Sequence, residues 1–448
     1  MVPSKISQWK EQGPAWGEKL FAIFVFFHST GGVIPLLRKE NGISFDPVQG
    51  DLIMQGLWFG VYLVTFFLLL SRLKQAAAGA SRLDKMIWFL LVLALISATW
   101  SASPCLTLRR TAALLGSSAF AIYLASCYTR QEIIRLIFWT LGLSAILSLA
   151  FVFLVPVYGI HHDFYHNGAW RGIYDHKNIL GRFMSLAAVT WILYIPGKAG
   201  ASTRGYIAKM VMLIIFAGLL FFSRSKTSIL VCIVLLPLLM LLPVRPGRRR
   251  QILMVATVVL LIGGAAFLLL HNPALSLEHK MFKVPADIPG FDFTLTGRTV
   301  LWQAVWDQIG QRPWLGYGFG AFWQGYGEPS GDLWRMLRWE PPNAHNGYLD
   351  LWLQLGLAGL SVFITSLVIN LFKILVLLNR KTEPLECFSL IFLLFLTLGN
   401  FAESLIPGQN SFFWIIYVCV AIKVNIAYQR AQLEGAVEKN KNRGSHSC

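Results

Sequence analysis

The chain has 448 residues, of which 55% are hydrophobic and only 14% charged, and its formal net charge is +17. A soluble protein would carry about a quarter charged residues, so this composition excludes an ordinary soluble protein and indicates a polytopic membrane protein. The positive charge does not call for nucleic acid, because lysine and arginine gather in the cytoplasmic loops of membrane proteins. The six cysteines stand singly with no CxxC spacing, which predicts neither a metal site nor a disulfide framework.

Apolar segments long enough to cross a bilayer recur along the chain. They predict an all-α protein of about twelve transmembrane helices, at residues 20–37, 52–71, 84–100, 108–127, 133–157, 178–195, 207–223, 226–243, 251–270, 347–378, 385–402 and 411–427. The first segment lacks a small-x-small cleavage pattern, which favours a retained anchor. The segment 347–378 is too long for one perpendicular span, so its first turns should lie along the interface or the helix should tilt.

Basic residues fall mainly in the loops on one face of the predicted helix array. An even number of spans puts both termini on that face, which the positive-inside rule makes cytoplasmic. Arg109 and Arg110 lie on the opposite face and break the pattern. The polar segment from about Gln429 is expected to be a disordered tail.

Two outward segments are longer than the other loops. The shorter, 158–177, is rich in histidine, and the longer, from about 271 to 346, is rich in aromatic residues, which predicts an ordered cap. The chain therefore divides into residues 1–270 with nine helices, the cap 271–346, residues 347–427 with three helices, and the tail 428–448.

The cap contains one predicted amphipathic helix. Apolar residues at 301, 304, 305 and 309 have helical spacing, Thr296 or Thr299 could cap the start, and Pro313 ends the helix. Glycines at 316, 318 and 320 then predict a flexible aromatic turn.

The residue best suited to catalysis is His345, at the junction between the cap and the helix that follows. A neutral imidazole there can accept a proton at physiological pH. Asn346 and Tyr348 are expected to support it, and Tyr348 or Trp323 could stack on a sugar, although packing is the more frequent use of such rings. The alternative for His345 is a histidine that only caps or tethers a loop.

Outward-facing cations predict an anionic ligand. They are Arg171, Lys177, Arg182, Arg224 and Arg298. A cation within the bilayer costs about 2.5–3.5 kcal/mol on insertion scales, so it usually faces a cavity or the interface. Arginine binds phosphate through paired hydrogen bonds, which favours a phosphate ligand. The alternative for Arg224 is snorkelling at a helix end.

The shorter loop carries titratable residues that do not match a metal-binding pattern. They are His161, His162, Asp163, His166, Asp175 and His176. Their spacing fits no standard ligand set, so no metal is predicted. Asp175, His176 and the nearby Asn178 are expected to shape the entrance by hydrogen bonding. Glu403, between the last two spans, could face the same cavity or only meet water.

Five motifs, in this order and spacing, resemble the O-antigen ligase/polymerase family, and most closely its exopolysaccharide polymerase branch. They read GIYDHKNILG at 172–181, SRS at 223–225, TGRTVLW at 296–302, RPWLGYGFGAFW at 312–323 and AHNGYLD at 344–350. The likeness extends over residues 80–425.

The resemblance implies a GT-C-type, metal-independent, inverting glycosyltransferase of the bacterial inner membrane, active on the periplasmic face, with no cofactor. Such an enzyme takes a glycan from undecaprenyl pyrophosphate and passes it to a lipid-linked repeat unit, as a polymerase, or to lipid A-core in lipopolysaccharide assembly, as a ligase. Membrane lipids, a chain-length regulator and a flippase are the further partners implied, and nucleic acid is not. The family's essential residues carry over by motif to His345, Arg224 and Arg298.

Elementary chemistry agrees with this expectation. A pyrophosphate leaving group needs positive charge, which Arg224 and Arg298 could supply, and a sugar hydroxyl needs a base, for which His345 is suited. No pair of carboxylates of the glycosidase type stands out, and the aromatic cap could exclude water. A twelve-span transporter of polysaccharide or lipid is the alternative from another class, although no internal repeat is evident. The choice between ligase and polymerase remains open.

Overall fold

The computed structural model describes residues 14–32, 51–163, 166–193, 203–241, 295–327, 329–337, 339–380 and 384–445. Over these ranges the regular elements are helices and no strand is present, in agreement with the predicted all-α class. The α-helices are α1 (Trp16–Ser29), α3 (Leu52–Ser71), α4 (Leu73–Ala80), α5 (Lys85–Ile96), α6 (Pro104–Cys127), α7 (Arg130–Leu154), α8 (Pro156–Gly159), α9 (Lys177–Leu193), α10 (Thr203–Phe222), α11 (Lys226–Leu241), α14 (Leu295–Gln311), α15 (Gly331–Leu337), α16 (Gly347–Arg380), α17 (Pro384–Asn400) and α18 (Phe412–Ser445).

Most of the predicted spans coincide with helices. Ten of the twelve segments do so over most of their length, and the first, 20–37, does so over residues 20–29. Residues 33–37 of the first segment and the whole ninth segment, 251–270, lie outside the described residues. Five helices, α3, α7, α10, α16 and α18, are long and apolar enough to cross a membrane. The outer faces of α3 and α10 expose large apolar side chains such as Phe66 and Ile214, as expected where a helix faces lipid. The architecture therefore fits a multi-pass membrane protein, and the count of twelve and the GT-C type remain predictions.

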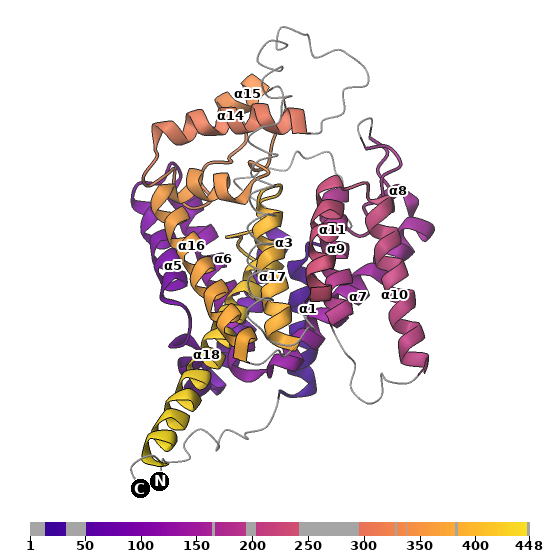
Figure 1. The fold of residues 1–448 in the computed structure, drawn as a ribbon. Coiled ribbons are helices and arrows are strands. Elements are labelled where there is room, and N and C mark those ends of the chain that lie inside the picture. The colour runs from indigo at the N-terminus through magenta and orange to yellow at the C-terminus, as the bar shows by residue number, and fades with distance from the viewer. Residues whose placement is uncertain are drawn as a thin grey trace.

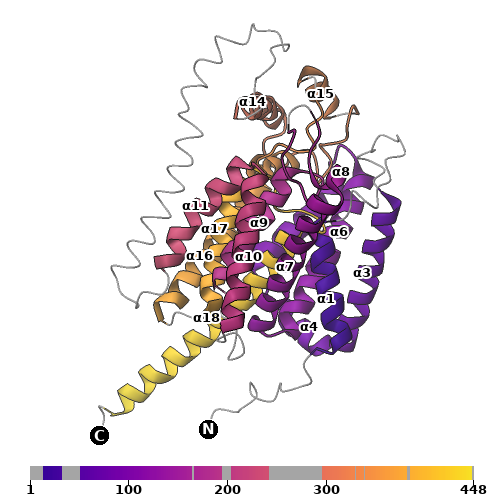
Figure 2. The same cartoon turned by 90° about the vertical axis from the view of Figure 1, so that its right-hand side faces the viewer.

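The helices form one bundle with different features at its two ends. Figure 1 shows α14 and α15 lying across one end, and the C-terminal part of α18 projecting from the other. Figure 2, turned by 90°, shows the same arrangement. Inside the bundle, α18 packs on α6 and buries Trp414 and Tyr417 completely. The first part of α18 therefore lies inside the bundle, directly after the connection 401–411 that joins it to α17.

The C-terminal segment differs from the prediction. α18 continues as a helix to Ser445, where the sequence predicted a disordered tail from about Gln429. Residues 431–441 are mostly good helix formers, and a helix that extends an existing one pays no new nucleation cost. The guanidinium of Arg380, at the end of α16, donates to the carbonyl of Ala431 and ties this extension to the bundle.

The longest predicted span is interrupted at Gly356. This glycine, at φ 66° and ψ −171°, divides α16 into a short first segment and a long second one. The N–H groups of the two residues after it donate to the carbonyls of Pro313 and Trp314, at 2.8 and 3.2 Å. The carbonyls two and three residues before it accept from the N–H groups of residues 317–318, both at 2.9 Å. Because the backbone groups freed by the break are paired again, the break fits the expectation that the first turns leave the main helix axis.

The described part of the cap is ordered and rests on this first segment of α16. In α14, Leu301, Val305 and Ile309 are at most 2% exposed, as their helical spacing predicted, and each buried side chain contributes about 1.5–3 kcal/mol. The helix ends at Gln311, shortly before Pro313. It begins at Leu295, so Thr296 and Thr299 both stand in its first two turns, and the capping role of either residue stays a prediction.

The glycine-rich turn of the cap also explains an exception in the charge pattern. Gly316, Gly318 and Gly320 all have positive φ, as a flexible turn requires. The guanidinium of Arg110 donates to the carbonyl of Gly320. Arg110 therefore holds the cap on the bundle, which accounts for a basic residue on this face.

Candidate functional site

His345 lies in a tight turn whose backbone is fixed from several sides. Its φ of +48° is in the left-handed region, where a residue other than glycine is strained by about 1 kcal/mol or more. The N–H of His345 donates to Asn343 Oδ1 at 2.9 Å, and the N–H of Ala344 donates to Asp350 Oδ1 at 3.0 Å. Trp302 of α14 donates its indole N–H to the carbonyl of Ala344 at 2.8 Å. The surroundings thus hold the imidazole in one position at the start of α16.

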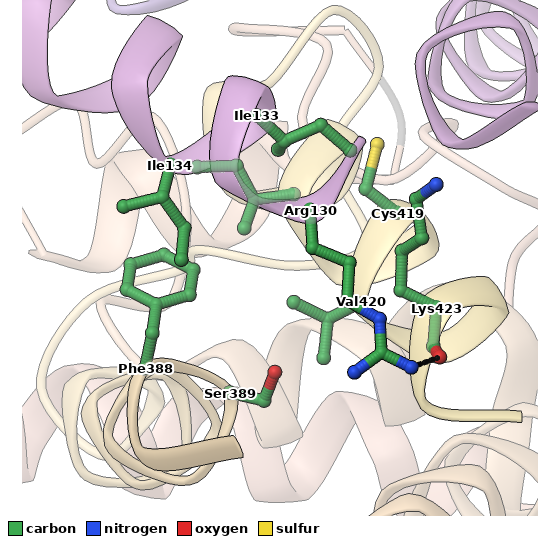
Figure 3. Close-up of a pocket in the computed structure, with 9 residues that line it drawn as sticks. Arg130, Ile133, Ile134, Phe388, Ser389, Cys419, Val420 and Lys423 are labelled. Carbon is green, nitrogen blue, oxygen red and sulfur yellow. Dashed lines mark hydrogen bonds between the residues drawn. The ribbon is translucent and has the colours of Figure 1, made fainter. Parts of the chain in front are cut away.

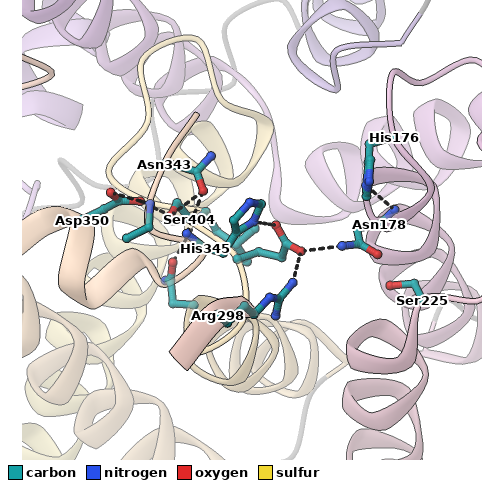
Figure 4. Close-up of polar contacts among 12 residues, drawn as sticks. His176, Asn178, Ser225, Arg298, Asn343, His345, Asp350 and Ser404 are labelled. Carbon is teal, nitrogen blue, oxygen red and sulfur yellow. Dashed lines mark hydrogen bonds and ion pairs between the residues drawn. The ribbon is translucent and has the colours of Figure 1, made fainter. Parts of the chain in front are cut away.

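Glu403 joins the candidate base to a candidate cation. His345 Nδ1 lies 3.4 Å from Glu403 Oε2, and Arg298 Nη2 donates to Glu403 Oε1 at 3.1 Å. Asn178 Nδ2 donates to the same Oε1 at 3.0 Å. Figure 4 shows these side chains converging from α9, α14, the turn before α16 and the connection between α17 and α18. Four segments far apart in sequence therefore meet at one carboxylate.

The electrostatic surroundings keep this carboxylate ionised. Burial raises the pKa of Glu403, but His345, Arg298 and Arg182 outweigh burial and lower it to about 2. Arg182 itself lies one turn into α9, with its guanidinium 5.4 Å from the ring of Phe413. Its Nε atom has no hydrogen-bond partner among the described residues. The group thus combines one negative charge with two guanidinium groups and an imidazole.

The predicted supporting residues beside His345 have packing and capping contacts. Asn346 Oδ1 accepts from the N–H groups of Tyr348 and Leu349, at 3.0 and 3.3 Å, and so caps α16. The hydroxyl of Tyr348 donates to the carbonyl of Thr397 at 3.0 Å and fixes α16 against α17. Asn346 and Tyr348 thus stabilise the start of α16 next to the His345 turn, through contacts with α16 and α17 rather than with Glu403.

Arg224 lies in a neighbouring group of residues, with no contact to His345. It occupies the turn between α10 and α11 at φ +51°, is exposed, and donates from Nη1 to the carbonyl of Asn167 at 3.2 Å. A Cβ placed on Gly181 would come within 2.7 Å of Ser225, so this turn packs directly on the start of α9. The turn that holds Arg224 therefore packs on α9 at Gly181, the residue before Arg182 in the sequence. Within the part of the chain that the structure describes, it forms no ion pair.

The loop 158–177 is held together by its own polar side chains. Arg171 donates from Nε to the carbonyl of Tyr158 at 2.8 Å, so this predicted phosphate ligand is used to tether the loop. The backbone N–H of Lys177 donates to His161 Nε2 at 3.1 Å, and Asp175 lies exposed just before α9. The side chain of Arg171 is thus directed at carbonyls of its own loop.

The sequence spacing of His161, Asp163 and His166 did not predict that they would gather, yet their ligand-type atoms lie within 4.8 Å of one another. Asp163 contacts His161 Nδ1 at 2.8 Å and His166 Nδ1 at 2.9 Å. Because His161 Nε2 accepts from Lys177, its Nδ1 must carry the proton that is donated to Asp163. Both nitrogens of His161 are then occupied, and hydrogen bonds explain the cluster without a metal.

His176 connects this cluster to the Glu403 group. Its ring centroid lies 5.3 Å from that of His161 and 5.0 Å from that of His166, and its Nδ1 accepts from the N–H of Asn178 at 3.2 Å. Burial, with the two neighbouring histidines, lowers the pKa of His176 to about 3, so it is neutral at physiological pH. The contact to Glu403 comes from Asn178, and the role predicted for Asp175, His176 and Asn178 in shaping an entrance stays a prediction.

Sequence reasoning gave Glu403 only as an open alternative and missed Asp350. Asp350 is 4% exposed and accepts from Ala344, from the indole of Trp323 at 2.8 Å and from Ser404. An acidic residue within the first two turns of an apolar helix was the available signal, because such a residue is costly unless paired. Trp323 is therefore occupied in holding the turn.

A separate small cavity lies far from these residues. It measures about 20 Å³ and is lined by Arg130, Phe388 and Lys423 among others, as Figure 3 shows. Arg130 forms an ion pair with Glu386 at 2.7 Å. Phe388 of this lining lies in α17 twelve residues before its end at Asn400, and Glu403 follows that end, so the cavity and the Glu403 group are different places in the bundle. Its volume holds a water molecule and no sugar.

Comparison with known proteins adds one finding. Residues 211–364 match the family model described as O-antigen ligase. The matched range contains the turn with Arg224, all of α14 with Arg298, and the turn with His345. No curated protein matches the chain.

Proposed function

Because the chain belongs to the O-antigen ligase/polymerase family, on the match over residues 211–364, we propose that it is a glycosyltransferase of surface polysaccharide assembly. The donor is a glycan on undecaprenyl pyrophosphate, and the acceptor is a lipid-linked repeat unit, at the periplasmic face of the bacterial inner membrane. The observation that carries this proposal is the convergence of His345 and Arg298 on Glu403, in one group that also includes Arg182.

His345 is suited to act as the general base. With Nδ1 directed at Glu403, Nε2 is left to accept a proton, and it has no hydrogen-bond partner among the described residues. The acceptor hydroxyl gives its proton to Nε2 as its oxygen forms a bond to the anomeric carbon. The bond from that carbon to the phosphate oxygen breaks, and the electron pair leaves with the pyrophosphate. Attack opposite to the leaving group inverts the anomeric configuration.

The arginines are suited to receive the charge of the leaving group. Arg298 and Arg182 carry two positive charges against the one negative charge of Glu403, and Arg224 on the adjoining turn adds a third. The surplus of two balances the two charges of a lipid-linked diphosphate diester. Fixed cations at the position where negative charge grows stabilise the transition state, and the transfer step then needs no metal ion. The aromatic cap would limit the access of water to the donor.

The acceptor decides between two activities of the same site. We propose the polymerase as the first candidate. The ligase is the second candidate, because the matched family model is described as O-antigen ligase. The purified chain should be reconstituted in liposomes with a lipid-linked repeat unit, with and without lipid A-core. A ladder of lengthening lipid-linked glycan without lipid A-core is the result expected of a polymerase. Product only when lipid A-core is present would establish the ligase, and no transfer in either case would refute the proposed function.

A further inference from the structure

Glu403 makes a different contact with each of its two carboxylate oxygens. Oε2 faces His345 Nδ1 at 3.4 Å, whereas Oε1 accepts from Arg298 at 3.1 Å and from Asn178 at 3.0 Å. One oxygen is thus directed at His345, the proposed base, and the other at Arg298, which is proposed to bind the diphosphate. The side chain is 17% exposed, so water can screen these contacts only partly.

Ser404, the residue after Glu403, also helps to fix the carboxylate of Glu403 relative to His345. Ser404 donates its hydroxyl to Asp350 Oδ2, and Asp350 accepts from the N–H of Ala344, directly before His345. The N–H of Glu403 donates to the carbonyl of Gly399 at 2.9 Å. The segment that carries the carboxylate and the turn that carries the imidazole are therefore linked through side chains and backbone. Such double fixing is what a catalytic pair needs to keep its geometry.

We propose that Glu403 is a positioning residue, which orients the imidazole of His345 and selects its Nδ1–H tautomer while it aligns Arg298. This inference rests on the proposed function, because it assigns Glu403 a role in the same transfer reaction. A carboxylate on Nδ1 keeps the proton there and leaves the Nε2 lone pair for the acceptor hydroxyl. It also stabilises the imidazolium that forms when the proton is taken up.

A purely structural role for Glu403 predicts different behaviour. If Glu403 only holds α9, α14 and the His345 turn together, Glu403→Gln would lower thermal stability and leave the pH dependence of the rate unchanged. If Glu403 positions the base, the same substitution replaces an acceptor by an amide that can donate to Nδ1 and favour the wrong tautomer. The triad of the serine proteases shows that a wrong tautomer lowers kcat by about 10⁴-fold. A loss of about 10²- to 10⁴-fold is expected here.

The charged groups around the pair must be considered in a pH experiment. His345 faces Glu403 and Asp350, and Glu403 faces His345, Arg298 of α14, Arg182 of α9 and His176 of the loop. Burial lowers the pKa of His176 to about 3, so His176 does not change its charge between pH 5 and 8. The comparison of the parent chain with the Glu403 variants therefore isolates the effect of this carboxylate on the acid limb of the rate profile.

The test measures kcat, the donor KM and the pH–rate profile of the full chain in liposomes, using a lipid-linked repeat unit as the probe. The variants are Glu403→Gln, Glu403→Asp and the matched control Glu340→Gln, which neutralises an exposed carboxylate of the cap. We expect Glu403→Gln to lose at least 100-fold in kcat and to shift or abolish the acid limb, Glu403→Asp to recover part of the rate, and the control to match the parent chain.

The double variant His345→Ala/Glu403→Gln separates the remaining interpretations. If Glu403 acts through His345, the second substitution adds no further loss of rate. A Glu403→Gln variant with kcat within threefold of the parent, or one that loses rate with an unchanged pH profile, would overturn the inference and leave the proposed function standing. An active His345→Ala combined with an inactive Glu403→Gln would make Glu403 itself the base. Absence of transfer by the parent chain would instead refute the proposed function. Where Glu403→Gln does not fold, the pH profile of Glu403→Asp decides.

Discussion

Replacement of Arg298 by alanine tests whether the cation beside Glu403 serves the reaction or only the fold. Arg298 donates to Glu403 at 3.1 Å, and the two side chains are 19% and 17% exposed. Loss of a partner from a buried ion pair costs about 3–5 kcal/mol, and from a fully exposed pair at most about 1 kcal/mol. Because Glu403 keeps its contacts with Asn178 and His345, we expect a loss of about 1–3 kcal/mol in unfolding free energy.

The expected loss of activity from Arg298→Ala is larger than that stability change would cause. Removal of one donor that stabilises developing negative charge lowers the rate by about 10²–10³-fold. Arg298→Lys keeps the charge but not the paired donors, so it should lie between the parent and the alanine variant. The assay is the initial rate of glycan transfer in liposomes, with thermal unfolding measured on the same preparations.

The matched control is Arg335→Ala, which removes an exposed arginine of α15 in the same cap. Arg335 pairs with Asp332, three residues before it, donates to the carbonyl of Tyr326 at 3.4 Å, and its side chain is 54% exposed. Its removal should change rate and stability little. A rate for Arg298→Ala within about threefold of the parent, at normal protein level, would refute the assignment of Arg298 to the diphosphate.

Three further predictions follow from the same contacts. Arg224→Ala should lose most transfer activity with a change in thermal unfolding of about 1 kcal/mol or less, because Arg224 is exposed and, within the described ranges, its side chain forms one hydrogen bond, to the carbonyl of Asn167; collapse of the fold would show a structural role instead. Gly356→Ala should destabilise by about 2 kcal/mol or more in chemical unfolding, since a Cβ there is strained at φ 66° and meets the backbone of Trp314; an unchanged midpoint would contradict the described break. The pKa of Glu403 is lowered from 4.5 to about 2, so this group stabilises the fold above pH 4.5 by at most about 3 kcal/mol and loses that contribution as the pH falls toward 2. Thermal unfolding of the parent chain should therefore weaken more between pH 5 and 3 than that of Glu403→Gln, and equal slopes would count against the ion pairs of this carboxylate.

The helices could be predicted from the sequence because membrane spans leave a strong local signal. A run of about twenty apolar residues identifies a helix wherever its neighbours lie, and the apolar spacing in α14 likewise matched the buried face. A departure of the first turns of α16 was expected from its length, but the position of the break at Gly356 could not be predicted. The residues around Gly356 are apolar, and the backbone segment that pairs with the break, 313–318, lies about forty residues away. The helical extension of α18 was missed because its polar composition was given more weight than its helix propensity.

The candidate site was only partly accessible to sequence reasoning. His345 and Arg298 could be identified by motif and charge, and the structure brings both to one carboxylate. The role of Glu403 could not be predicted from the surrounding sequence. A single acidic residue in a loop between two spans shows no residue spacing that would indicate whether its carboxylate is buried in a contact or exposed to water. Arg171 has the right charge but is used within its own loop, which only tertiary contacts reveal.

In the proposed reaction, the imidazole of His345 removes the proton of the acceptor hydroxyl, next to arginines that hold a lipid diphosphate. The most direct measurement is single-turnover transfer from a lipid-linked repeat unit by the reconstituted chain, comparing His345→Ala with His162→Ala. His162 is an exposed histidine of the other loop, and its ring contacts the carbonyl of Pro156. We predict that the chemical step is lost in His345→Ala, with donor binding retained, and that His162→Ala transfers at the parent rate. Transfer by His345→Ala at a rate close to that of the parent chain would contradict the account.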